Sequence, residues 1–199
     1  HNPLTNFKNM NIISQNTLLT GGSGFLGRKI VSSNIFQNLL VPSRSKLDII
    51  NKASIKNYFL DNDFDLIIHA AALARMGECE ASPKNAVEIN TVGTANIVNN
   101  ILQQEIRRNK SIRFVYISTD GVYQSVSGGY SENSATIPYN VYGWTKLGGE
   151  CAVKLLANHC IIRTRFFDPE SIPVSSRSAS SRITSRRKRC CHCVAVECK

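Results

Sequence analysis

Two residues four positions apart, Tyr142 and Lys146, have the types and spacing in this sequence that most directly suggest chemistry. They stand at the start of a helical pattern, where this spacing places both side chains on one helix face. A tyrosine titrates near about 10, so it exchanges protons at neutral pH only where a neighbour favours the phenolate. Lys146 is the candidate neighbour. Such pairs also occur by chance on surface helices. The rest of the chain must therefore supply a cofactor site and a third catalytic group if this pair is to indicate catalysis.

A glycine-rich segment follows the first apolar run, Asn16–Thr20, and helical spacing runs from Arg28 to Phe36. This order predicts a strand, a tight turn and a helix. In such a turn the glycines permit the bend, the approach of backbone amides to a pyrophosphate and close helix packing, and the helix N-terminus attracts phosphate. The predicted cofactor contacts here are Gly21, Gly24, Phe25, Leu26 and Gly27.

The next expected strand, Asn38–Val41, is followed by Arg44 where an NAD-selective site usually carries an acidic residue. A guanidinium can pair with a 2′-phosphate, which favours NADP(H) as cofactor and leaves NAD(H) open. A solvated loop arginine is the simpler alternative. Asp48, with Ile49, is expected either to bind the adenine amino group or to cap a helix over Ala53–Leu60.

A continuous apolar run from Asp65 ends in small residues, as expected for a parallel strand buried on both faces. Ala70, Ala71 and Ala72 leave room for a flat ligand, so they join the predicted cofactor contacts. His69 is expected to be structural rather than catalytic. A long helical stretch, Pro83–Asn109, follows and contains Asn90, which is expected to hydrogen-bond neighbouring backbone.

The strand expected over Arg113–Ile117 delivers Thr119 to its carboxyl end, the edge at which open α/β sheets bind ligands. Its hydroxyl could hold a substrate carbonyl alongside Tyr142. A polar loop, the helix carrying Tyr142 and a strand over Cys160–Thr164 complete the pattern. The sequence thus predicts an α/β fold, a doubly wound parallel sheet of the Rossmann type, over residues 15–168.

Composition narrows the function further. The formal charge is +10, yet residues 1–170 hold 17 basic and 13 acidic residues, so the last 29 residues carry the remaining +6. Nucleic-acid binding by the domain is therefore not expected. Scattered cysteines in the body do not indicate a disulfide framework. No apolar run reaches membrane-helix length and no signal peptide is recognisable, so we expect a cytoplasmic protein without membrane association.

Both ends lie outside the expected domain. Residues 1–14 read as an N-terminal leader, and residues 169–199 as an irregular basic Ser/Arg/Cys tail without periodicity, interpreted first as out-of-frame or truncated sequence. A nucleic-acid segment is disfavoured because no aromatic residues separate the charges. A zinc site is disfavoured because adjacent cysteines cannot all face one ion, and no metal is predicted. The ligands of such a zinc site would be Cys190, Cys191, His192, Cys193 and Cys198.

These motifs together resemble the extended short-chain dehydrogenase/reductases, and within them most nearly the dTDP-4-dehydrorhamnose reductases. The resemblance covers residues 15–168 and rests above all on Pro138–Glu150. It implies that Tyr142 protonates the C4 carbonyl of a nucleotide-linked 4-keto sugar and that Thr119 orients this oxygen. It also implies that Lys146 lowers the Tyr142 pKa and holds the nicotinamide ribose, so both residues count as cofactor contacts. The family's C-terminal substrate domain is apparently missing.

Alternatives within this resemblance remain. Dehydratases of this kind carry an acidic residue at the position that Gly121 occupies here, after Asp120, so the absence of that acid disfavours water elimination. Epimerases usually carry Ser-Ser or Ser-Ala where this chain has Thr119 and Asp120, which disfavours them more mildly. Gly121 and Trp144 depart from the reductase pattern. A non-catalytic NADP-binding regulatory subunit is the rival from another class, although a pure binder needs no proton donor. A homodimer is left open.

Overall fold

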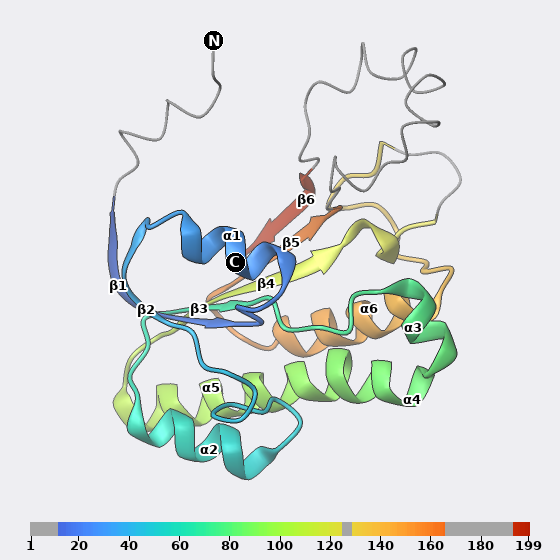
Figure 1. The fold of residues 1–199 in the computed structure, drawn as a ribbon. Coiled ribbons are helices and arrows are strands. Elements are labelled where there is room, and N and C mark those ends of the chain that lie inside the picture. Colours follow the sequence, from blue (N-terminus) through green and yellow to red (C-terminus); the bar gives the residue numbers. More distant parts are fainter. Residues whose placement is uncertain (1–11, 125–128, 166–192) are drawn as a thin grey trace.

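The computed structural model describes residues 12–124, 129–165 and 193–199. Within these residues six strands form one sheet in the order β2-β1-β3-β4-β5-β6, in which the first five run parallel and β6 runs antiparallel to β5 (Figure 1). The strands are β1 (Ile13–Thr20), β2 (Phe36–Leu40), β3 (Leu66–His69), β4 (Arg113–Thr119), β5 (His159–Thr164) and β6 (Cys193–Cys198).

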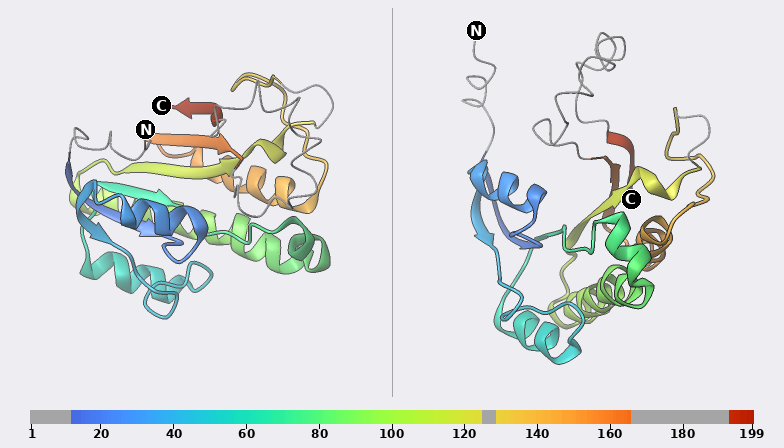
Figure 2. Two further views of the ribbon diagram at one scale, coloured as in Figure 1. Left: turned by 45° about the horizontal axis from the view of Figure 1, so that its top comes forward. Right: turned by 45° about the vertical axis from the view of Figure 1, so that its right-hand side comes forward.

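Helices cover both faces of the sheet, with α1 on one face and α2, α5 and α6 on the other (Figures 1 and 2). The helices are α1 (Phe25–Ser32), α2 (Lys52–Asp61), α3 (Met76–Ala81), α4 (Pro83–Ala86), the π-helix η2 (Val87–Gly93), α5 (Thr94–Arg108), the 3₁₀-helix η3 (Asp120–Val122) and α6 (Val141–Val153). The doubly wound Rossmann-type prediction is confirmed. Among the described helices, none has the length and apolarity needed to cross a membrane.

The main core lies between the sheet and the α2/α5/α6 layer. Leu18 of β1, Ile67 of β3 and Phe114 of β4 point into it, together with Ile55 of α2 and Ile97 of α5. Residues next to these in the strands point the other way and form a smaller cluster under α1. Burial on both faces explains why β3 is apolar without alternation.

The chain changes direction in the sheet at β1. From β1 it passes through α1 to β2 on one side, and from β2 through α2 to β3 on the other. The carboxyl ends of β1, β2 and β3 therefore flank a switch point, where open α/β sheets leave a crevice for ligands. This topology positions the site described below.

The structure changes several expected boundaries. Helix α1 begins at Phe25, directly after Gly24, and ends at Ser32, so Phe36 belongs to β2 rather than to the expected helix. The predicted stretch over residues 83–109 is helical but contains the π-helix η2. Helix α3 was not predicted. Asn51, not Asp48, caps α2, because its side chain accepts a hydrogen bond from the Ser54 amide.

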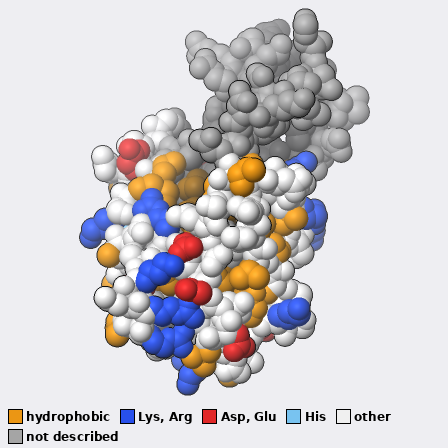
Figure 3. Space-filling model, turned by 90° about the vertical axis from the view of Figure 1, so that its left-hand side faces the viewer, with side chains coloured by type: hydrophobic (Ala, Val, Ile, Leu, Met, Phe, Trp, Pro, Cys, Tyr) orange, Lys and Arg blue, Asp and Glu red, His pale blue; other side chains and the backbone are white. Residues whose placement is uncertain are grey.

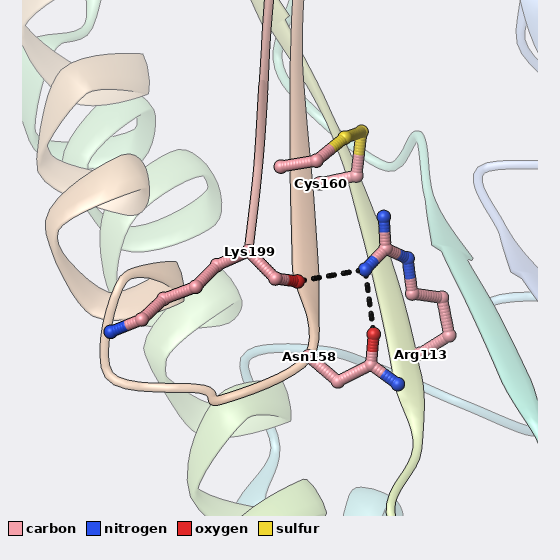
Figure 4. The surroundings of a disulfide bond; sticks show 5 residues. Arg113, Asn158, Cys160 and Lys199 are labelled. Carbon is pink, nitrogen blue, oxygen red and sulfur yellow. Dashed lines mark hydrogen bonds between the residues drawn. A yellow bond between two sulfur atoms is a disulfide. The ribbon is translucent and has the colours of Figure 1, made fainter.

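The tail departs from the expectation of irregular structure at Cys193–Cys198, which forms β6 against β5. Cys160 is bonded to Cys198, so one body cysteine is in a disulfide after all. Nearby, the Arg113 guanidinium donates to the Lys199 carbonyl at 2.9 Å and to the Asn158 side chain at 2.6 Å (Figure 4). The remaining tail residues lie outside the described part of the chain.

Basic and acidic side chains are interspersed on the face shown in Figure 3. The described ion pairs include Arg108 with Asp63 and Lys110 with Asp65, each joining a residue at the end of α5 or just beyond it to the loop before β3. Charge in this part of the domain is thus locally paired.

Candidate active site

A cavity of about 880 Å³ opens at the switch point. Its walls come from the segments that follow β1, β2 and β3, as the topology requires. It gathers most of the predicted cofactor contacts, namely Gly21, Gly24, Arg44, Asp48, Ile49, Ala70, Ala71 and Ala72. Phe25, Leu26 and Gly27 lie on the adjoining α1 and do not line it, and Phe25 is exposed.

The turn after β1 has no room for larger residues. Gly21 has a φ of +74°, and a Cβ there would lie 2.5 Å from the Ala71 amide nitrogen. A Cβ on Gly27 would lie 2.3 Å from the Gly21 carbonyl oxygen, so this glycine allows α1 to pack on the turn. Gly24 caps α1 without a side-chain hydrogen bond. The turn and the helix N-terminus therefore offer backbone amides, as phosphate binding requires.

Charged side chains reach the cavity from two elements. Arg44 follows β2, and its Nε lies 3.5 Å from an Asp48 carboxylate oxygen in an exposed pair. Arg28 of α1 also lines the cavity and donates to the Ser23 carbonyl. We did not single out Arg28 from the sequence. The sequence signal that could have identified it is its position one turn into the helix that follows the glycines, close to the expected phosphate site.

Thr119 and Tyr142 meet at the carboxyl end of β4, and neither lines the cavity. Asn140 caps α6 by accepting from the Gly143 amide at 2.7 Å, and the Val141 amide donates to Glu80 at 2.8 Å, so α6 begins at a fixed point. The pKa of Tyr142 is raised to about 12, chiefly by burial and then by the charges of Cys79 and Asp120, while a hydrogen bond with Thr119 opposes the rise. The phenol is therefore protonated at neutral pH.

Lys146 is buried one turn further along α6, with its Nζ 4.0 Å from the centroid of the Tyr116 ring. Burial lowers the pKa of Lys146 to about 7, against the opposing charge of Glu150. Lys146 is not among the groups that shift the Tyr142 pKa. The lowering of the Tyr142 pKa that we expected from the lysine is thus not seen in this structure. Burial instead raises the pKa of this phenol.

His69 and Asn90 form a buried polar network behind the site. The two ring nitrogens of His69 lie 2.7 Å from the Thr20 hydroxyl and 3.1 Å from the Thr94 hydroxyl. Burial, and then the charge of Lys146, lower the pKa of His69 to about 3. A neutral histidine with both nitrogens engaged fits the structural role predicted for it.

Asn90 lies in η2 and its amide contacts two segments. It accepts from the Leu73 amide at 2.8 Å, donates to the Leu73 carbonyl at 3.0 Å and donates to the Thr145 hydroxyl at 3.0 Å. The first two bonds match the expected backbone role. The third links the segment after β3 to α6 and was not predicted, because Thr145 is 55 residues away in sequence.

A second buried network, also missed from the sequence, joins α6 to β4 and β5. The Glu150 carboxylate accepts three hydrogen bonds from the Arg163 guanidinium, at 2.7 to 3.2 Å, and one from the Ser118 hydroxyl at 2.5 Å. Arg163 also donates to the Tyr123 hydroxyl at 2.8 Å. The described residues contain no group of three or more His, Cys, Asp or Glu able to hold a metal.

A doubly wound sheet with a glycine cradle at its switch point and a Thr, Tyr and Lys set beside it defines a dinucleotide-binding domain of the short-chain dehydrogenase/reductase class. Residues 15–167 match the model of the RmlD substrate binding domain, and the chain belongs to that family.

Curated relatives include two different kinds of protein. The chain is 34% identical over 139 residues to a dTDP-4-keto-6-deoxy-D-glucose reductase of Streptomyces niveus, covering 68% of this chain and 46% of that protein. It is 30% identical over 149 residues to methionine adenosyltransferase 2 subunit beta of Xenopus laevis, covering 70% and 43%. The chain thus spans about half the length of the curated relatives it matches.

Among solved structures, the dTDP-4-dehydrorhamnose reductase of Bacillus anthracis in complex with NADP superposes with a TM-score of 0.68 at 28% identity. The match covers 77% of this chain and 54% of that one. The likeness therefore extends from the sequence to the fold over the covered part of the chain.

Proposed function

We propose that this chain carries the cofactor-binding and proton-donating half of an NADP(H)-dependent reductase that acts on a nucleotide-linked 4-keto sugar. The observation that carries the proposal is the meeting of Thr119 with a protonated, half-buried Tyr142, next to the buried Lys146 and the glycine-cradled cavity. Two of the similar proteins described above are named as reductases of dTDP-linked sugars, which supports this substrate class.

The cavity fits a dinucleotide phosphate. Gly21 and Gly24 allow close approach of a pyrophosphate to backbone amides, and the small side chains of Ala70–Ala72 line the same cavity. Arg28 and Arg44 bring positive charge to the same cavity, as a 2′-phosphate requires. When bound, a nicotinamide cofactor supplies hydride for carbonyl reduction.

The side chains supply the proton. Reduction of a carbonyl places negative charge on its oxygen, and a neutral phenol beside that oxygen can donate a proton to it. Tyr142 is in this state at neutral pH, as a tyrosine with the ordinary pKa of about 10 would be, and burial shifts its pKa further in the same direction, to about 12 in total. The Thr119 hydroxyl shares a hydrogen bond with Tyr142 and would orient the same oxygen. Lys146, buried one turn further along α6, would hold the nicotinamide ribose of the bound cofactor.

The test compares Tyr142→Phe with Tyr139→Phe, an exposed tyrosine three residues earlier that serves as the matched control. NADPH binding is followed by fluorescence titration, and turnover by NADPH oxidation with a dTDP-4-keto-6-deoxy sugar. Tyr142→Phe should keep the NADPH affinity and lose turnover by roughly 10²–10⁴-fold, while the control should match the unsubstituted chain. A Tyr142→Phe variant with unchanged turnover would contradict the assigned role.

A second candidate is an NADP-binding regulatory subunit, favoured by the similarity to methionine adenosyltransferase 2 subunit beta. A regulatory subunit would bind NADP(H) through the same cavity and show no sugar turnover. Its effect on a partner enzyme would be insensitive to Tyr142→Phe. The retained Thr119, Tyr142 and Lys146 set favours the reductase, since binding alone needs no proton donor.

A further inference from the structure

Glu150 lies where several parts of the proposed site meet. It follows Lys146 by one helical turn on α6 and is fully buried. Its carboxylate accepts from Ser118, the residue immediately before Thr119, and from Arg163 of β5, which is itself buried. One side chain therefore ties the helix of Tyr142 and Lys146 to the strand end that carries Thr119.

The carboxylate of Glu150 also acts electrostatically on Lys146. This ammonium faces the neutral ring of His69 from β3 and the ring of Tyr116 from β4, and Tyr142 lies one turn before it. Glu150 supplies the negative charge that acts on Lys146 in this interior. The Arg163 guanidinium holds the carboxylate by three hydrogen bonds, so the carboxylate has a fixed orientation.

We propose that Glu150 is a positioning residue, which sets the charge of Lys146 and the place of Thr119 by tying α6 to β4 and β5. The proposal deepens the proposed function and rests on it for the catalytic meaning of Lys146 and Thr119. The contacts of Glu150 stand independently of any cofactor or substrate. A buried ion pair that served only packing could be replaced by a neutral pair without changing Lys146.

The experiment separates these two roles with a pair of variants of the 199-residue chain. Glu150→Gln leaves the buried Arg163 charge with only the more distant Glu197 carboxylate, at 3.6 Å, as an ionic partner. Glu150→Gln with Arg163→Gln removes both charges of the buried pair and keeps groups that can hydrogen-bond. Urea unfolding reports the fold. The Lys146 titration is followed by NMR of isotope-labelled lysine side chains, and the Lys146 signal is identified by its loss in Lys146→Arg.

We expect Glu150→Gln to lower the urea midpoint and the double variant to recover most of it. In the double variant Lys146 should still titrate roughly one to three pH units below its value in the unsubstituted chain, the shift expected when an opposite charge close by is removed. A double variant that restores both the midpoint and the Lys146 titration would overturn the proposal, as would Glu150→Gln with an unchanged midpoint. Failure to bind NADPH would instead count against the proposed function alone.

Discussion

Two arginines give the cavity a charge that its backbone does not supply. Arg28 and Arg44 line it from α1 and from the segment after β2. If they recognise a 2′-phosphate, their loss should affect the phosphorylated cofactor only. The Arg44–Asp48 pair is exposed, so Arg44 can exchange that weak contact for a phosphate at little cost.

We predict that Arg44→Ala weakens NADPH binding by roughly 10- to 100-fold, the loss of one charge-assisted hydrogen-bonding partner, and leaves NADH binding unchanged. Calorimetric titration with both cofactors measures the ratio. Lys46→Ala is the control, because Lys46 is an exposed base two residues away that does not line the cavity. Equal losses for NADPH and NADH would exclude a specific phosphate contact.

His69 predicts a pH dependence of stability. Its pKa is lowered to about 3 in the fold, from about 6.5 in an unfolded chain, so the unfolded state binds a proton first as the pH falls. The contribution of neutral His69 is therefore fully present above about pH 6.5 and is lost as the pH falls towards 3, by up to roughly 1.4 kcal/mol per pH unit.

His69→Asn should accordingly flatten the change of unfolding free energy between about pH 6.5 and 4, measured by urea denaturation. The matched control is His159→Asn, which removes another buried histidine from β5. The assignment fails if His69→Asn keeps the slope of the unsubstituted chain. A loss of packing lowers the unfolding free energy by the same amount at every pH, so comparing the slopes against pH isolates the contribution of the His69 titration.

At the scale of elements, the π-helix η2 holds Asn90 where one side chain contacts both the segment after β3 and α6. Asn90→Ala would leave the Leu73 amide and carbonyl without these partners. We expect it to lower the free energy of unfolding by roughly 1–3 kcal/mol, mainly through the unpaired Leu73 amide, because the Leu73 carbonyl still accepts from the Cys79 thiol. Asn99→Ala, at an exposed position of α5, should change it little. Similar losses for the two variants would show that the Asn90 contacts contribute little.

The elements themselves were largely predictable. Apolar runs such as Leu66–His69 and the glycines before α1 carry local signals of strand, turn and helix. The π-helix was not predictable in the same way, since a single extra residue in a turn leaves the apolar spacing almost unchanged. Helix α3 is only six residues long, below the length at which periodicity can be recognised.

Contacts between elements were the hardest to foresee. The glycine contacts and the cavity wall follow from one local motif, whereas Glu150 meets Arg163 only because α6 packs beside β5. The protonation states of Tyr142 and Lys146 depend on this burial. The residue types of the site could therefore be predicted from their spacing, but the direction in which the Tyr142 pKa is shifted could not.

For the whole molecule, the Cys160–Cys198 bond predicts a stability that depends on reducing agent. Without reductant, Cys198→Ser should lower the free energy of unfolding by about 2–4 kcal/mol, because the unfolded chain is no longer cross-linked. Cys151→Ser, which removes an exposed free thiol, should have no such effect. Peptide mapping without reduction should recover the 160–198 link. Equal stability of the unsubstituted chain and Cys198→Ser under both conditions would contradict it.

Strand β6 occupies the edge of β5 opposite β4. A strand edge offers one row of amides and carbonyls, so it can hold one partner at a time. Any other strand that pairs with this edge of β5, from the same chain or another, must compete with β6 for that row. The covalent bond to Cys160 gives β6 the advantage in this competition, so reduction of the bond would be the first step of any exchange at this edge.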